Sequence, residues 1–277
     1  QQFSEYRKKQ AQYIEGTQKE LNVKISELDR NKKEKSEILT DQQKEKRTLG
    51  IQKNSKSKVL NSLTSQEKKL KQELTQKQRE SAILNRAIQN AINREIEEAR
   101  KRAEAEARAA AAKAKAENKD APDYKPVASG SSILAATPES AKLSSDFLGS
   151  RGSLPWPVTN GMIIEDFGNH TIGRNVTTEN NGVDIKTAPG SAVRAVFGGE
   201  VAAVQNISGS YAVLIRHGEY FTVYSNLKSV NVSRGQKVTL KQNIGVVITD
   251  PIDGTTEVHF EVRKGATPMN PAGWLAN

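Results

Sequence analysis

The chain carries few side chains that could do hydrolytic chemistry, and two of them have the types of metal ligands. Asp184 ends the stretch Asn180-Asn181-Gly182-Val183-Asp184, and His259 ends Glu257-Val258-His259. Hydrolytic zinc sites use three protein ligands and leave the fourth position to a water whose pKa the metal lowers. One aspartate and one histidine would hold zinc weakly. Glu257 is the candidate for a rescuing ligand or general base, because alternate residues of a strand share one face.

The remaining candidates do not complete such a site. The absence of cysteine excludes disulfides and thiolate metal ligands. His217 directly follows a predicted strand and is expected to be a turn or framework residue, and His170 is expected in a surface loop. Neither has a partner at ligand spacing. We therefore expect no metal, no cofactor and no hydrolytic activity.

The elements that position these residues are short β-runs separated by Gly, Asn, Asp and Pro. Seven such runs with frequent turns predict an antiparallel all-β domain over residues 154–277. At this length the domain is large enough to fold alone. The predicted strands are 162–167, 192–196, 200–206, 211–216, 220–225, 244–248 and 257–263.

The first half of the chain is predicted to be an α-helical coiled coil. Apolar residues recur at heptad spacing from Ile14 and, more strongly, from Leu60 to Ala91. The stretch 48–55, which contains Gly50, is the plausible break. Two helices joined there would form an antiparallel hairpin, and the alternative is one long helix that dimerises with another chain.

Three domains are predicted in all. Residues 1–118 form the helical hairpin and, from 95, an exposed Ala-rich helical arm. Residues 119–153 form a linker with a short amphipathic helix at 138–148, which carries Phe147 on its apolar side. The β-domain follows from residue 154.

Charge separates the two halves of the chain. The net charge is +10, and it arises within residues 1–118, where 28 Lys/Arg face 18 Asp/Glu. These basic residues alternate with acids and lack interleaved aromatics, so a solvated helix near an acidic polymer or anionic membrane is favoured over a nucleic-acid partner. No apolar stretch is long enough to span a bilayer. The chain starts in a helical pattern without a signal segment, which suggests a processed or truncated exported product.

A succession of motifs resembles the LytM/lysostaphin-type metallopeptidase domain over residues 155–275. Active members carry His-x-x-x-Asp, a His before Leu, and His-x-His before Phe-Glu. By position, Asn180 replaces the first zinc ligand, whereas Asp184 and His259 keep the other two. Asn226 and Glu257 replace the two catalytic histidines. The motifs are Asn180-Asn181-Gly182-Val183-Asp184-Ile185, Ala188-Pro189-Gly190-Ser191, Gly198-Gly199-Glu200-Val201, Arg216-His217-Gly218, Tyr224-Ser225-Asn226-Leu227 and Val258-His259-Phe260-Glu261-Val262-Arg263.

The order of coil, arm, short helix and degenerate LytM domain is similar to that of the murein hydrolase activators. This resemblance implies a periplasmic, non-catalytic activator of N-acetylmuramoyl-L-alanine amidases in daughter-cell separation. It implies that the amidase binds the empty cleft, that a division-associated ABC-transporter complex binds the coil, and that peptidoglycan is a further ligand. A helix, either 138–148 or the arm before it, would cover the cleft. The alternatives are an active zinc-dependent peptidoglycan endopeptidase and a division scaffold that acts through its coil.

Overall fold

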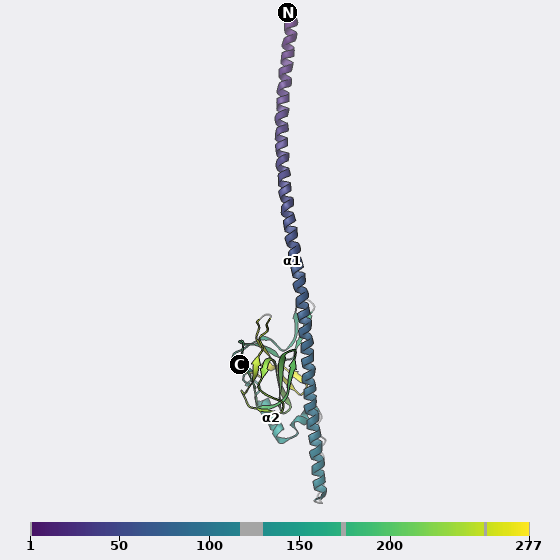
Figure 1. The fold of residues 1–277 in the computed structure, drawn as a ribbon, viewed down its shortest axis with the longest axis vertical. Helices are drawn as coiled ribbons and strands as arrows, with labels where there is room; N and C mark the ends of the chain where they lie inside the picture. The colour runs from purple at the N-terminus through teal and green to yellow at the C-terminus, as the bar shows by residue number, and fades with distance from the viewer. Residues whose placement is uncertain (1, 117–129, 173–175, 252–253, 277) are drawn as a thin grey trace. The chain divides into compact units, whose positions relative to one another are not determined.

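A computed structural model describes residues 2–116, 130–172, 176–251 and 254–276 (Figure 1). The chain divides into two compact units, Gln1–Leu74 and Thr75–Asn277. The first unit is part of the long helix α1 (Gln2–Ala116), and the second combines the rest of α1 with an antiparallel β-sheet. The predicted fold class, an N-terminal helix followed by an all-β domain, is therefore confirmed. The unit boundary lies within α1, well before the predicted domain boundary at residue 118.

Helix α1 is continuous through the predicted turn at residues 48–55, so the prediction of a hairpin is wrong. An isolated glycine costs a helix only about 1 kcal/mol relative to alanine, and Gly50 has no proline beside it. Ion pairs one turn apart, such as Lys19–Glu15 and Lys24–Glu20, add small local stabilisation. Helix propensity is therefore sufficient to carry the helix through this stretch.

The sheet of the second unit contains ten strands, and a separate hairpin contains two. The main path runs β1-β4-β11-β8-β7-β6-β9, while β10 joins β5 and β8, and β12 joins β11. All seven predicted strands are present, and the hairpin contains His170, which was expected in a loop. The strands are β1 (Met162–Glu165), β2 (Gly168–Ile172), β3 (Val176–Asn180), β4 (Val183–Lys186), β5 (Ala192–Arg194), β6 (Gly199–Ile207), β7 (Ser210–His217), β8 (Tyr220–Val230), β9 (Lys237–Val238), β10 (Asn243–Val247), β11 (Glu257–Lys264) and β12 (Thr267–Met269).

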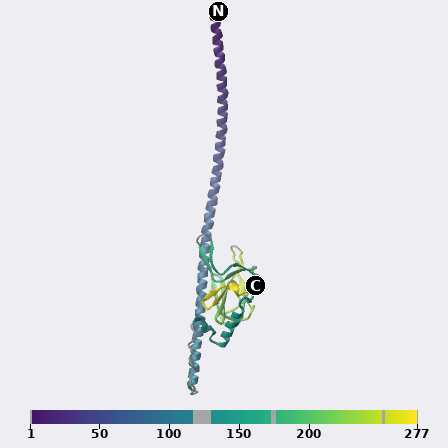
Figure 2. The same cartoon turned by 180° about the vertical axis from the view of Figure 1, so that it is seen from behind.

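Strand β8 contributes side chains to two separate apolar clusters. Tyr220 and Tyr224 belong to the main core, whereas Phe221 and Val223 belong to a second cluster that includes residues of α1. Because successive strand residues point to opposite faces, the sheet has a core face and a helix-covered face. In both views the part of α1 where the colour passes from blue to teal runs beside the sheet (Figure 1 and Figure 2).

The predicted short helix exists as α2 (Pro138–Gly149), with Thr137 accepting a hydrogen bond from the Ser140 amide at its N-terminus. Phe147 is fully buried in the main core and stacks on His217 at a centroid distance of 4.7 Å. Since Phe147 completes the core, the folded module begins before residue 154. The 3₁₀ helix η1 (Gly130–Ala135) precedes α2, and η2 (Pro271–Gly273) lies near the C-terminus. Most of the predicted linker, residues 120–129, lies outside the described residues.

Candidate functional site

The structure brings Asp184 and His259 together on the helix-covered face. Strands β4 and β11 pair with Asp184 opposite His259, and Asp184 Oδ1 lies 2.8 Å from His259 Nδ1. The flanking residues Val183 and Ile185 are fully buried in the main core. The alternation of the strand therefore turns Asp184 away from the core and toward His259.

Asn180 joins this pair at the end of β3. Its side-chain Nδ2 donates to Asp184 Oδ2 at 3.0 Å, and its Oδ1 accepts from the Gly182 amide at 3.0 Å. Three of the five predicted site residues, Asn180, Asp184 and His259, are thus directly connected. Both carboxylate oxygens of Asp184 accept hydrogen bonds within this group.

Glu261 and Arg263 extend the same face along β11, and sequence reasoning missed both. His259 Nε2 lies 3.1 Å from Glu261 Oε1, and Arg263 Nε donates to Glu261 Oε2 at 2.5 Å. Both residues are about 1% exposed. A signal was available, because Glu257, His259, Glu261 and Arg263 alternate with apolar residues and so must share one polar face of the strand.

Asn85 of α1 closes the network from the helix side. Its Oδ1 accepts from Arg263 Nη2 at 3.3 Å and from Asn181 Nδ2 at 3.2 Å. One turn further along the helix, Gln89 Nε2 donates to the Ala266 carbonyl at 3.0 Å. The helix is therefore bonded to the polar network that contains the candidate site.

The charges in this network determine the protonation of His259. Burial lowers the pKa of His259, but hydrogen bonds and charge from Asp184 and Glu261 outweigh it and raise the pKa to about 10. Burial likewise raises the pKa of Glu261, but His259 and Arg263 bring it below its ordinary value. The network then holds two cations and two anions, which compensates the cost of burying each charge.

These residues do not fit a hydrolytic zinc ion as they are arranged. Zinc binds a free nitrogen of a neutral imidazole, whereas His259 engages a carboxylate at each nitrogen, Asp184 at Nδ1 and Glu261 at Nε2. Asn180 directs its amide Nδ2, a donor, at Asp184. Among the described residues, no group of three His, Cys, Asp or Glu side chains could hold a metal.

The other two predicted site residues lie at the margin of this network. Asn226 adopts a left-handed backbone conformation with φ of 61°, immediately after Ser225, which is paired with His259. Asparagine tolerates this conformation better than most residues. Glu257 is half-buried opposite Lys186, two residues before His259 on β11. Both residues therefore lie next to the site. Within the part of the chain that the structure describes, Asn226 makes no hydrogen bond to Asp184 or His259.

The helix-covered face continues from the polar network into an apolar contact. Ile88, Ala91 and Ile92 of α1 are buried against β6, β7 and β8. Full burial of an isoleucine side chain contributes about 1.5–3 kcal/mol. The segment of α1 from Leu84 to Ala99, which we call the docked segment, was expected to be partly coil and partly exposed arm, and it is instead packed on the sheet.

Ion pairs fix the far end of the docked segment. Glu95 lies 3.7 Å from Arg216 and 3.4 Å from Arg234, and Glu98 lies 3.0 Å from Arg234. The Glu95 side chain is only 12% exposed, so its ion pairs are less screened than those on an open surface. The docked segment is therefore held by a polar network at one end, isoleucines in the middle and carboxylates at the other end.

Helix α2 does not take the position predicted for a covering helix. Its Ser144 Oγ accepts from the Glu219 amide at 2.8 Å, and Phe147 packs on Tyr220 and Trp274. Tyr220 pairs with Lys264, five residues along β11 from His259. The apolar residue of α2 therefore serves the main core, and the docked segment of α1 is the helix beside the site.

His217 is a buried framework residue, as expected. Its Nδ1 lies 2.7 Å from the Gly198 carbonyl, and its Nε2 lies 2.9 Å from Thr222 Oγ1. Burial lowers the pKa of His217 to about 4, although the hydrogen bond to Gly198 opposes the shift. The imidazole is thus neutral and donates from Nδ1 to the carbonyl.

Comparison with known proteins gives the class of this domain. Residues 178–271 match the model of Peptidase family M23. The match runs from β3 to η2 and includes the network residues Asn180, Asp184, His259, Glu261 and Arg263, but not Asn85 of α1. The chain therefore carries a domain of the M23 type on an antiparallel sheet. Among solved structures, the chain is similar to the SpoIIQ–SpoIIIAH pore-forming complex, with 25% identity, 46% of this chain and 92% of that chain covered, and a TM-score of 0.40.

The curated relatives are more specific. The murein hydrolase activator NlpD of Salmonella typhimurium is 27% identical over 57% of this chain and 42% of its own length. The murein hydrolase activator EnvC of Escherichia coli is 28% identical over 55% of this chain and 34% of its own length. The chain thus spans about two fifths or less of the curated relatives it matches. No described helix has the length and apolar character needed to cross a bilayer.

Proposed function

We propose that this protein is a non-catalytic activator of periplasmic N-acetylmuramoyl-L-alanine amidases in daughter-cell separation. The observation that carries the proposal is the hydrogen-bonded network of Asn180, Asp184 and His259, which the motif resemblance aligns with the three zinc ligands, together with Glu261 beside His259. Both imidazole nitrogens of His259 are engaged by carboxylates, so neither is free to bind a zinc ion. Similarity to relatives named murein hydrolase activators supports the same role.

The amidase would bind the helix-covered face around Asp184 and His259. This face holds Phe221 and Val223 between a polar network and the two arginines Arg216 and Arg234. An apolar centre with charged groups at both ends suits recognition of another protein. Asn226 and Glu257, at the margin of the network, would lie at the edge of that interface.

The docked segment would restrain this binding. It covers Phe221 and Val223 with Ile88 and Ile92, so the amidase and the segment would compete for one surface. Displacement of the segment by a force on α1, or by a competing helix, would expose the face. This assigns the covering role to residues 84–99 of α1, and not to residues 138–148.

A peptidoglycan-release assay tests the proposal with dye-labelled cell wall, an amidase and the full chain. Ile92→Asp should weaken docking, so the variant should stimulate the amidase more than the unchanged chain does. Ile83→Asp is the matched control, because Ile83 lies on the same helix but is 53% exposed. Glu95→Lys, which would repel Arg216 and Arg234, is a second undocking variant if Ile92→Asp reduces folding.

Each alternative function has its own outcome in this assay. Release of soluble fragments by the chain and zinc, without amidase, would establish a peptidase and contradict the proposed non-catalytic role. Stimulation that is equal for the unchanged chain and for both undocking variants would leave the activator role intact and contradict the covering role. No stimulation by any variant would favour a scaffold.

A further inference from the structure

A stripe of α1 within the first unit carries leucines and charges at coiled-coil spacing. Its eight members, which we call the seam, are separated by alternating steps of four and three residues. The seam consists of Leu49, Lys53, Lys56, Leu60, Leu63, Glu67, Leu70 and Leu74. This is the spacing of residues that face a partner helix in a coiled coil.

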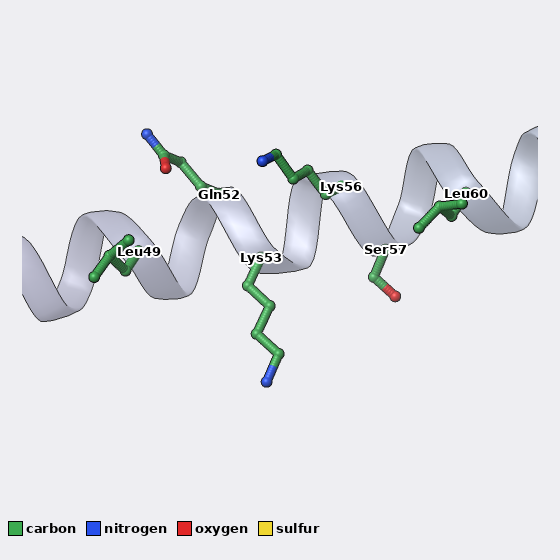
Figure 3. A pocket seen from close by; sticks show the side chains of 6 residues that line it. All are labelled: Leu49, Gln52, Lys53, Lys56, Ser57 and Leu60. Atoms are coloured by element: carbon green, nitrogen blue, oxygen red, sulfur yellow. The ribbon is translucent and has the colours of Figure 1, made fainter.

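Four of the five leucines of the seam are exposed, and Leu74 is half-buried. Leu49, Leu60, Leu63 and Leu70 have exposed fractions of 58%, 63%, 56% and 64%. Figure 3 shows the first part of the seam, where Leu49, Lys53, Lys56 and Leu60 project from α1 around a shallow surface hollow. Four exposed leucines on one stripe form more than the scattered apolar residues of an ordinary helix surface, and a partner helix would bury them.

The charges of the seam exclude a parallel, in-register pair of copies. Such a pair places each residue of the seam opposite itself. Lys53, Lys56 and Glu67 would then form three layers of like charge in the centre of the interface. Like charges that face each other at short distance destabilise a helix pair.

The same residues fit an antiparallel pair in one register. We infer that the seam pairs with the seam of a second copy of this chain, with Leu60 opposite Leu63 of the other copy. The facing residues are then Leu49 with Leu74, Lys53 with Leu70, Lys56 with Glu67, and Leu60 with Leu63, each layer occurring twice.

In this register both the leucines and the charged residues of the seam face suitable partners. Leucine faces leucine in four layers, and Lys56 faces the oppositely charged Glu67 in two. Lys53 can lay its alkyl stem on Leu70 and keep its ammonium in water. Two of the positions that flank the seam, Lys71 and Glu73, are charged. The other six are uncharged, so they add no repulsion, and they are Gly50, Gln52, Ser57, Val59, Thr64 and Gln66.

Neighbouring antiparallel registers lose these matches. A shift of one heptad in one direction leaves the leucines facing Lys, Glu or Gln, with no leucine pair. A shift in the other direction pairs Leu60 with Leu70 but places Lys53 opposite Lys77. The pattern of the seam therefore specifies one arrangement, about 39 Å long at 1.5 Å per residue.

Sedimentation of the full chain tests the inference. We expect a concentration-dependent dimer at up to about 100 µM, the range of a weak association. Lys56→Glu would create two Glu–Glu layers and should raise the dimer Kd about tenfold or more. Combining Lys56→Glu with Glu67→Lys reverses both members of the pair and should restore the original Kd to within about threefold.

The rescue separates this arrangement from others. In a parallel pair Lys56→Glu would only exchange one like-charge layer for another, so neither the single nor the double variant would change the Kd by tenfold. Lys58→Glu is the matched control, because it makes the same charge change two residues away, on the opposite side of the helix from the seam, and should leave the Kd unchanged. A chain that stays monomeric, or a double variant that is no tighter than Lys56→Glu, overturns the inference. Neither result bears on amidase activation.

Discussion

At the scale of single residues, the candidate site is a set of compensated charges in place of a metal centre. Asp184, His259, Glu261 and Arg263 form an alternating chain of anion and cation on the helix-covered face. Loss of one member leaves its neighbours buried without a counter-charge. Such a loss is far more costly than loss of an exposed ion pair.

Glu261→Gln should therefore lower the free energy of unfolding by about 3 kcal/mol, since Arg263 and His259 lose a buried carboxylate. Glu200→Gln is the control, because Glu200 pairs with Arg216 at the surface with 40% of its side chain exposed, and it should cost below about 1 kcal/mol. Chemical denaturation at neutral pH measures both. Equal effects of the two substitutions would contradict the network.

His217 should make the module less stable in mild acid. Its pKa of about 4 in the folded state is below its value of 6.5 in the unfolded chain, so protonation favours unfolding. Stability is complete above pH 6.5 and should fall by up to about 3 kcal/mol as pH drops toward 4. His217→Gln should remove this component of the pH dependence. An imidazole NMR signal that titrates near 6.5 in the folded chain would refute it.

At the scale of elements, α2 packs closely against the turn between β7 and β8. Gly218 has φ of +72°, and a Cβ there would overlap Ser144 Oγ. Gly218→Ala should therefore destabilise the module by about 1–3 kcal/mol through strain and loss of the α2 contact.

Gly209→Ala separates these two effects. Gly209 has a similar φ of +89°, but nothing lies within 4 Å of an added Cβ. It should show the backbone strain alone, so its melting temperature should fall less than that of Gly218→Ala. Equal shifts would mean that the contact between Gly218 and α2 contributes nothing.

Some of these elements could be predicted from the sequence alone, and others could not. Periodicity and turn residues were sufficient for the seven strands and for α2, because each pattern is local. The resemblance of the motifs to the LytM-type domain also grouped Asn180, Asp184 and His259. The position of the docked segment was not predictable in this way, because Ile88 and Ile92 fit a coiled-coil stripe and a sheet-packing stripe equally well. Glu261 was overlooked because its role depends on the partner residues His259 and Arg263.

At the scale of the whole molecule, α1 is one helix with two different environments. Its stretch from 51 to 72 is exposed, whereas Ile88 and Ile92 in the second unit are buried on the sheet. The docked segment is held by contacts at its two ends and its centre, so weakening one end should release it in part.

Glu95→Gln should speed amide hydrogen exchange in residues 88–98 by about tenfold, because Arg216 and Arg234 lose a shared, nearly buried carboxylate. Glu97→Gln on the exposed side of the same turn is the control. Hydrogen exchange with mass spectrometry follows the segment directly. Unchanged exchange in Glu95→Gln would show that the ion pairs of Glu95 do not hold the segment.

The burial of Trp274 has a practical consequence for watching this protein work. Trp274 is fully buried against Phe147 and Tyr220, and Trp156 also packs on the main core, on the side of the sheet away from Ile88 and Ile92. Intrinsic tryptophan emission should therefore change when α2 detaches from the core. It should not change when α1 leaves the sheet. A change in emission on addition of an amidase would point to rearrangement of the core. Release of the helix needs a dye on α1 to be seen, and the chain's lack of cysteine allows a single thiol to be introduced for that purpose.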